Sequence, residues 1–467
     1  MNKGSIGEDA ADALVDQARE RCAAGDLLEA RSLLMGSLAQ HPTHYRTLME
    51  LGELLRRTDY RSAARLTFQE AARHHPTQAA AHLALGHMDR EEEEWQAARR
   101  LYEAALAIQP DLAPAHQGLS YVLQELGESE QARNHRDRGF GRDPWFSLPY
   151  RGAAKPLTVL LLVSAVGGNI PVESILDNAQ FRVHVVAVDY WQPASGLPAH
   201  DVVFNAIGDA DVAESSLQAA KSVVDFSGRP VVNPLERIRE TGRQQVMERI
   251  RGLSGVRTAR MIPMSRDELL LPGVGEHLLA QGFRCPFLLR AVGYHTGRHF
   301  VSIDDLGQIR SALSQMPGYS FWVIERLDTA HADGTFRKFR IMMVDGKLWP
   351  LHCAISNQWK VHYYTALMDV PEYQDMESAF LGNMSDFLGT DALARLESIQ
   401  EVLGLDYGGI DFDIVETGEV MLFEANATMV IPSLQHIPAH TPRHQAVLAI
   451  QSRAQDMLRR RAGIGSR

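Results

Sequence analysis

The chain has 467 residues, which is room for two or three globular domains. Hydrophobic residues make up 45% and charged residues 22%, as in an ordinary globular protein with a core. Residues 1–150 hold 17 basic and 23 acidic side chains, so they carry −6 of the net charge of −11 and the remainder carries −5. This evenly spread acidity disfavours binding to a nucleic-acid backbone.

The cysteines and the apolar stretches indicate the cellular compartment in which the protein is expected. Cys22, Cys285 and Cys353 lie far apart, without disulfide or metal spacing, which is typical of reduced thiols. The first 15 residues are acidic and have no apolar core, so no signal peptide is expected. The longest apolar stretch, Leu157–Val166, is shorter than the about 20 residues that a bilayer requires. We predict a cytoplasmic protein without a membrane or nucleic-acid partner.

The first third of the chain repeats every 34 residues. The period joins Pro42, Pro76, Pro110 and Pro144, then Ala30, Ala64, Ala98 and Ala132, and then Leu51, Leu85 and Leu119. Proline ends a helix because it has no N–H to donate, and small residues let two helices pack closely. The pattern resembles the tetratricopeptide repeat and predicts a helical solenoid over residues 10–148. Such a solenoid offers a concave face to a peptide or protein partner, although stabilising the chain or self-association stays open as its role.

Residues 155–253 alternate between apolar runs and helical segments. Strands are expected at 157–163, 181–188, 201–206 and 231–232, with helices at 172–179, 213–224 and 235–250. This alternation predicts a parallel, doubly wound α/β subdomain. Gly167 and Gly168 follow the first strand, but the dinucleotide-binding fingerprint is missing.

Residues 254–465 read as two α+β lobes. Single strands are expected at 287–291, 299–302, 321–325 and 359–366, and helices at 376–387, 392–402 and 444–461. One hairpin, 339–344 with 348–354, turns at Asp345-Gly346, and another, 409–415 with 420–424, turns at Thr417-Gly418.

The last hairpin carries the most informative chemistry. Glu424 and Asn426 share one face of a strand because side chains alternate with a period of two. Asp411 can lie opposite them on the neighbouring strand. Two carboxylates and an amide oxygen are hard ligands, suited to Mg²⁺ bound together with nucleotide phosphates. Such acidic residues are usually only solvated, but burying them unpaired in this apolar strand would be costly.

This segment resembles the metal-binding end of ATP-grasp enzymes such as glutathione synthetase, D-alanine–D-alanine ligase and ribosomal-protein glutamate ligase. Other motifs of that family follow in its order over residues 156–435. The resemblance implies ATP and two Mg²⁺ ions as cofactors, with the metal held by Asp411, Glu424 and Asn426. It implies nucleotide contacts from two basic residues, a glycine-rich loop and a hinge strand: Arg243, Arg290, Gly293, His295, Gly297, Trp322, Val323, Ile324 and Glu325. Arg340 would meet the transferring phosphate and the acyl group.

Two positions depart from the family pattern. Arg243 and Arg290 stand where relatives commonly have lysine, in a chain with six lysines and 41 arginines. Arginine also binds phosphate, as a planar fork rather than a point charge. Gly409 stands where some members have an additional arginine, so Arg340 would act alone or with another group.

The segment between the two hairpins offers candidates for substrate contact. Lys360 and His362 would share a face of the strand at 359–366 and are, with Arg340, the expected catalytic residues. His352 and Ser356 could face the carboxylate or the amine. For all four, a place on an exposed sheet face is an equal alternative.

The expected activity is an ATP-dependent carboxylate–amine ligase that forms a C–N bond through an acyl phosphate. The substrate would be a small-molecule carboxylate or amine, with a peptide, protein or carrier-bound partner recruited by the repeats. Two alternatives remain: an ATP-grasp phosphotransferase that forms no amide, and a nucleotide-binding scaffold without turnover.

Overall fold

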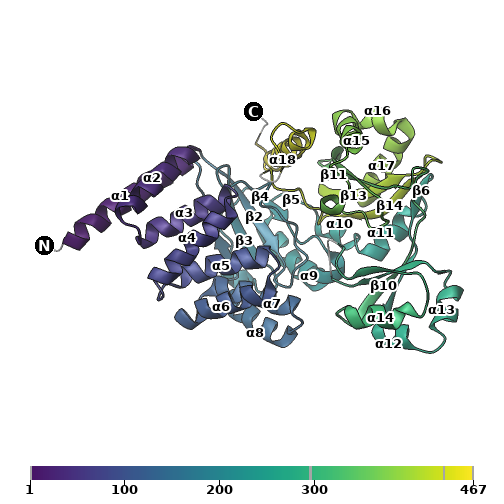
Figure 1. Ribbon diagram of the computed structural model, residues 1–467, viewed down its shortest axis with the longest axis horizontal. Coiled ribbons are helices and arrows are strands. Elements are labelled where there is room, and N and C mark those ends of the chain that lie inside the picture. The colour runs from purple at the N-terminus through teal and green to yellow at the C-terminus, as the bar shows by residue number, and fades with distance from the viewer. Residues whose placement is uncertain (1–2, 294–296, 435–436, 465–467) are drawn as a thin grey trace. The chain divides into compact units, whose positions relative to one another are not determined.

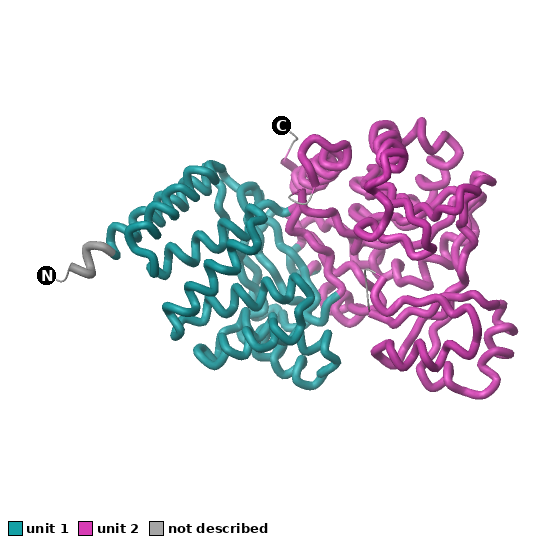
Figure 2. The backbone as a smooth tube through the Cα atoms, in the orientation of Figure 1, with its two compact units in different colours: residues 1–167, 176–201, 225–227 teal, residues 168–175, 202–224, 228–467 magenta. Residues whose placement is uncertain are grey.

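The structure is a computed structural model that describes residues 3–293, 297–434 and 437–464. It divides into two compact units (Figure 2). Unit 1 holds residues 1–167, 176–201 and 225–227, and unit 2 holds residues 168–175, 202–224 and 228–467. The division of the chain into three domains stays a prediction. Within the described residues, no helix combines the length and the apolar character needed to cross a bilayer.

The repeats of unit 1 form helical pairs, as predicted (Figure 1). The helices are α1 Lys3–Ala23, α2 Leu27–Gln40, α3 Tyr45–Arg57, α4 Arg61–His74, α5 Ala79–Glu91, α6 Trp95–Ile108, α7 Ala113–Glu125 and α8 Ser129–Phe140. Glycine is required where an aromatic ring of the second helix packs against the first. A Cβ on Gly52 would lie 2.5 Å from the Phe68 ring, and a Cβ on Gly86 would lie 3.0 Å from the Tyr102 ring. Both rings are fully buried, so the repeated glycines make room for the core.

A small sheet continues unit 1 after the repeats. Strand β2 (Leu157–Val163) pairs in parallel with β3 (Phe181–Ala187), as expected. On its other side β3 pairs antiparallel with an unexpected strand, β1 (Trp145–Ser147). The last helical turn of the solenoid is joined to this sheet, because Tyr190 donates a 2.6 Å hydrogen bond to Asp137 and stacks on Phe140. The short 3-10 helix η1 covers Pro193–Ser195.

The helix expected at 172–179 is wrong, because this segment forms turns. The carboxylate of Asp177 accepts a hydrogen bond from the backbone N–H of Ala179 at 3.0 Å. Such local bonds from aspartate compete with helix formation.

Unit 2 begins with parallel strands β4 (Val202–Asn205) and β5 (Val231–Val232), and with helix α9 (Ala210–Ser227), whose last residues belong to unit 1. The helix expected at 235–250 is interrupted, giving α10 (Leu235–Arg239) and α11 (Arg243–Ile250). The break occurs at Gly242, and the backbone N–H of Arg243 donates to Asp211 at 2.9 Å. Arg243 therefore begins a helix instead of lying within one.

The next part of unit 2 is a lobe built on an antiparallel sheet with the order β7-β10-β8-β9 among its described residues. Its strands are β7 Met261–Ser265, β8 Phe287–Ala291, β9 Phe300–Ile303 and β10 Ser320–Glu325, and its helices are α12 Arg266–Leu270, α13 Val274–Ala280 and α14 Gln308–Gln315. Phe287, Leu289, Phe321 and Val323 form the core between the sheet and these helices.

The second lobe is built on a sheet with the order β12-β11-β13-β14-β6. Its strands are β6 Val256–Thr258, β11 Phe336–Val344, β12 Lys347–Ser356, β13 Tyr407–Ile414 and β14 Val420–Asn426. The helices of this region are α15 Pro371–Gly382, α16 Met384–Leu388, α17 Thr390–Leu403 and α18 Pro442–Arg461. Both predicted hairpins are confirmed, and at the first turn Asp345 and Gly346 adopt φ of 50° and 74°.

The strand expected at 359–366 is wrong. Strand β12 ends at Ser356, whose hydroxyl accepts a hydrogen bond from the backbone N–H of Gln358 at 3.1 Å. The chain then bends into the 3-10 helix η2, Tyr363–Thr365. The fold class is otherwise as expected: helical repeats, then parallel α/β strands, then two α+β lobes.

Candidate functional site

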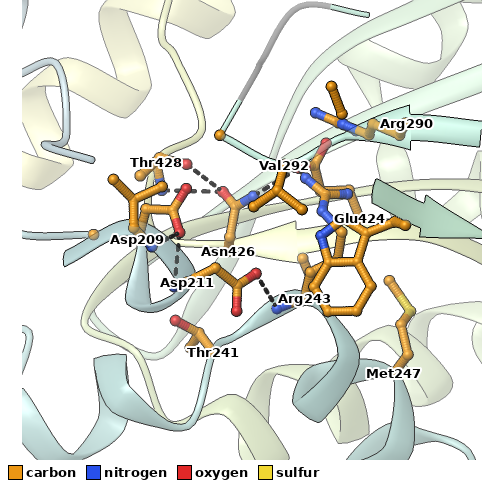
Figure 3. A pocket seen from close by; sticks show the side chains of 16 residues that line it. Asp209, Asp211, Thr241, Arg243, Met247, Arg290, Val292, Glu424, Asn426 and Thr428 are labelled. Atoms are coloured by element: carbon orange, nitrogen blue, oxygen red, sulfur yellow. Dashed lines mark hydrogen bonds and ion pairs between the residues drawn. The ribbon is translucent and has the colours of Figure 1, made fainter. Parts of the chain in front are cut away.

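A hollow within unit 2 gathers side chains from both lobes and from the start of α9 (Figure 3). It has about 550 Å³ of space, including the part open to solvent. Six of the predicted site residues line it: Arg243, Arg290, Gly293, Trp322, Glu424 and Asn426. Arg290 and Trp322 lie side by side because they are paired residues of β8 and β10.

Arg243 and Arg290 are the basic residues that line the hollow, together with the carboxylates of Asp209, Asp211 and Glu424. Nη2 of Arg243 lies 2.5 Å from Oε1 of Glu424. Arg290 is buried, with its guanidinium 5.6 Å from the centre of the Phe300 ring. Burial and the nearby charge of Arg243 lower the pKa of Arg290 to about 10, which keeps it charged at neutral pH. Two guanidinium groups at one hollow suit a polyphosphate.

Four paired residues extend from the hollow across the large sheet. His352 on β12 pairs with Arg340 on β11, Arg340 pairs with Asp411 on β13, and Asp411 pairs with Glu424 on β14. Directly paired residues share one face of a sheet, so these four side chains form a line, which we call the polar row. The structure thus places Asp411 opposite Glu424, as the sequence indicated.

Asp411 is held by cations inside the polar row. Arg340 donates to both of its carboxylate oxygens, at 2.6 and 2.8 Å, and Nζ of Lys338 lies 3.2 Å from one of them. Burial alone would raise the pKa of Asp411, but these two cations hold it well below its usual range. Lys338 has no counterpart among the predicted residues, although its position two residues before Arg340 on one strand was a signal for it.

The donor set for a metal is present, with its oxygens engaged elsewhere. Asn426 donates to Glu424 at 3.0 Å, and its amide oxygen accepts from the backbone N–H of Thr428 at 3.0 Å. The described His, Cys, Asp and Glu side chains form no group of three or more that could hold a metal ion. Two carboxylates and an amide oxygen on one sheet face still fit Mg²⁺ chemically. To bind the ion, Asp411 would have to release Arg340 and Glu424 would have to release Arg243.

Two aspartates at the start of α9 were missed by the sequence interpretation. Asp209 is the N-cap of α9 and accepts from the backbone N–H of Asp211 at 2.9 Å. Both line the hollow beside Arg243, and burial raises the pKa of Asp211. An aspartate before a helical run is a recognised N-cap signal, but it does not reveal that this helix begins at a site.

The remaining candidates lie outside the hollow. Nζ of Lys360 donates to the carbonyl of Phe300 at 3.2 Å and approaches Gly297, so this side chain contacts the small lobe. Lys360 and His362 do not share a strand face, because no strand forms there. Burial, together with the charges of Lys338 and Arg340, lowers the pKa of His362, which places it near the polar row.

Three residues of the predicted hinge strand, Val323, Ile324 and Glu325, lie on β10 of the four-stranded antiparallel sheet. Val323 and Ile324 pair with β7 on one side and β8 on the other. The Glu325 carboxylate accepts from the backbone N–H of Arg260 at 3.0 Å. The predicted contact of His295 lies outside the described residues.

Comparisons with known proteins give distant matches. No protein-family model and no curated protein matches the chain. Among solved structures, a crystal structure of MamA matches with 23% identity over 27% of this chain and 72% of that chain, with a TM-score of 0.25. MamA from Desulfovibrio magneticus RS-1 matches with 18% identity over 28% and 73%, with a TM-score of 0.26. The VanG D-Ala:D-Ser ligase from Enterococcus faecalis matches with 11% identity over 66% and 100%, with a TM-score of 0.40.

Proposed function

We propose that this protein is an ATP-dependent carboxylate–amine ligase that works through an acyl phosphate. The observation that carries the proposal is the polar row, which joins the arginine-lined hollow at Glu424 to the cations Arg340 and Lys338. One end suits the phosphates of a nucleotide, and the middle suits a carboxylate that attacks the terminal phosphate.

The chain's own residues divide the work along this line. Arg243 and Arg290 bind the phosphates in the hollow, and the burial of Arg290 strengthens its attraction for them. Arg340 and Lys338 orient the substrate carboxylate and stabilise the charge that develops on its oxygens. When bound, Mg²⁺ would be held by Asp411, Glu424 and Asn426 and would neutralise phosphate charge.

The reaction balances in two steps. A carboxylate oxygen attacks the γ-phosphorus of ATP, and the bond to the β-phosphate oxygen breaks to release ADP. The amine nitrogen then attacks the acyl carbon, inorganic phosphate leaves, and the nitrogen loses a proton.

The repeats would recruit the substrate or a partner. A helical solenoid of this length offers a long surface for a peptide or protein. The acid or the amine is therefore proposed to be borne by a peptide, a protein or a carrier.

The test is product analysis of a cell extract incubated with the protein and Mg-ATP. Mass spectrometry should find a condensation product, with one ADP and one phosphate released for each amide. Arg340→Gln should abolish the product, whereas Arg337→Gln should not, because Arg337 is on the same strand and pairs with Asp333 at 2.7 Å. A phosphorylated product without amide would establish a phosphotransferase instead, and a protein that binds no nucleotide would refute both.

A further inference from the structure

The far end of the polar row carries a histidine without a hydrogen-bond partner. His352 is only 5% exposed, and neither of its ring nitrogens has a partner among the residues that the structure describes. A buried polar group left unpaired costs free energy, and such groups usually find partners. An unpaired imidazole one strand beyond Arg340 therefore points to a ligand group.

A second cation lies beyond His352. Arg443 is in the first turn of α18, and its guanidinium carbon lies 3.5 Å from the centre of the Tyr363 ring. The Tyr363 ring in turn lies 4.9 Å from that of His352. The Nε of Arg443 is buried without a hydrogen-bond partner within the described chain. We call His352, Tyr363 and Arg443 the distal cluster.

The first turn of α18 is an unfavourable place for a cation such as Arg443. The start of a helix carries a partial positive charge, so a cation in the first turn is repelled and an anion is attracted. The nearby carboxylate of Glu377 is engaged elsewhere, since it accepts from the Tyr363 hydroxyl at 3.0 Å and from the backbone N–H of Cys353 at 3.2 Å. Its charge reduces the repulsion on Arg443 and leaves the buried Nε unpaired.

The charged side chains around the polar row also leave an excess of positive charge. Glu424 of the row is offset by its ion pair with Arg243. Of the other charged groups, Lys338, Arg340 and Arg443 contribute three positive charges, against two negative charges from Asp411 and Glu377. One positive charge remains, and it increases once Asp411 serves a metal ion. The reacting carboxylate accounts for the cations at Arg340, which leaves the distal cluster to bind another anionic group.

We propose that the distal cluster binds a second carboxylate of the acid substrate, so that the enzyme selects dicarboxylic acids, free or at the end of a peptide. This proposal rests on the proposed function. Neighbouring strands lie about 4.8 Å apart, so a group at His352 is about one strand spacing from the carboxylate at Arg340. A short dicarboxylate such as glutarate spans this separation, and Arg443 suits a carboxylate because its planar fork can donate two parallel hydrogen bonds.

The test compares two acids of equal length on the full-length protein in the presence of Mg-ADP. Isothermal titration calorimetry should detect glutarate binding and at least tenfold weaker binding of pentanoate, which lacks the second carboxylate. Arg443→Gln should remove this preference, and Arg443→Lys should retain part of it. Arg453→Gln is the matched control, because Arg453 is an exposed residue of the same helix. Equal binding of both acids, or an unchanged preference in Arg443→Gln, would overturn the proposal, as would inorganic phosphate binding more tightly than glutarate.

Two further measurements keep the result interpretable. If Arg443→Gln does not fold, the ring nitrogen resonances of His352 in the wild-type protein provide the test. They should shift with glutarate and not with pentanoate, and equal shifts would refute the subsite. Binding of Mg-ATP is measured separately: selective glutarate binding without nucleotide binding supports the subsite and refutes the ligase, and the reverse result refutes only the subsite.

Discussion

Replacing Glu424 by glutamine separates two roles of this carboxylate: the ion pair with Arg243 and the proposed binding of a metal ion. In the structure Glu424 pairs with Arg243 at 2.5 Å, and the two side chains are 23% and 14% exposed. Glutamine keeps the shape and can still accept a hydrogen bond, while Asp209 and Asp211 also attract Arg243. We therefore expect the free energy of unfolding without ligand to fall by about 1–2 kcal/mol, less than the about 3–5 kcal/mol expected when a fully buried pair is broken.

The larger effect should appear with Mg-ATP. At a ligand concentration of about 100 times the Kd, binding stabilises the native state by about 2.7 kcal/mol. If Glu424 is a metal ligand and glutamine weakens affinity about 100-fold, the same concentration stabilises the variant by only about 0.4 kcal/mol. The Tm increase produced by Mg-ATP should therefore almost disappear.

The assay is thermal unfolding of both proteins with and without Mg-ATP. Glu416→Gln is the matched control, since Glu416 is exposed in the turn of the same hairpin and should keep the full increase. A lower Tm of ligand-free Glu424→Gln decides nothing, because the Arg243 contact alone predicts it. An equal Mg-ATP-induced increase in wild type and Glu424→Gln would refute the metal assignment.

Three further predictions concern stability. Asp411→Asn leaves Arg340 and Lys338 facing each other without a charged partner, so urea denaturation should show a loss of about 3–5 kcal/mol, and a loss below about 1 kcal/mol would contradict the buried-pair argument. Burial raises the pKa of Asp413, on β13, to about 6, so between about pH 4 and pH 6 the native state holds a proton that the unfolded state has lost. The free energy of unfolding should therefore fall as the pH rises from about 4 through 6. The Asp413→Asn variant should not show this fall in stability. Phe68→Ala empties the space above a repeat glycine, so circular dichroism should show unit 1 destabilised by about 3–5 kcal/mol, and a smaller loss would mean that the solenoid repacks.

The features predicted correctly from the sequence depend on local rules. The repeats follow from a 34-residue period, and the hairpin at Asp345-Gly346 follows from turn chemistry. The pairing of Asp411 with Glu424 follows from strand alternation across a short turn. Each of these follows either from a regular spacing or from residues that are close in the sequence.

The features missed or wrong depend on distant contacts or on competing local bonds. Arg243 donates a hydrogen bond to Glu424, which is 181 residues away in the sequence, and no sequence pattern predicts that the two residues are in contact. Tyr363 belongs to an expected strand that instead forms a 3-10 turn, which brings its ring to His352 and Arg443. The sequence therefore proposes candidate side chains for the chemistry, while the fold decides which of them meet.

The short strand β1 has a consequence for anyone who wishes to graft these repeats onto another enzyme. It follows directly from α8 and forms the edge of a sheet whose other strands come after residue 155. A cut at that residue would remove one of the two strands that pair with β3, and the edge of β3 left unpaired could template aggregation. It would also remove Phe140 from its stacking contact with Tyr190. The transferable module is therefore longer than the repeat pattern, and a successful chimera should carry β2 and β3 with it.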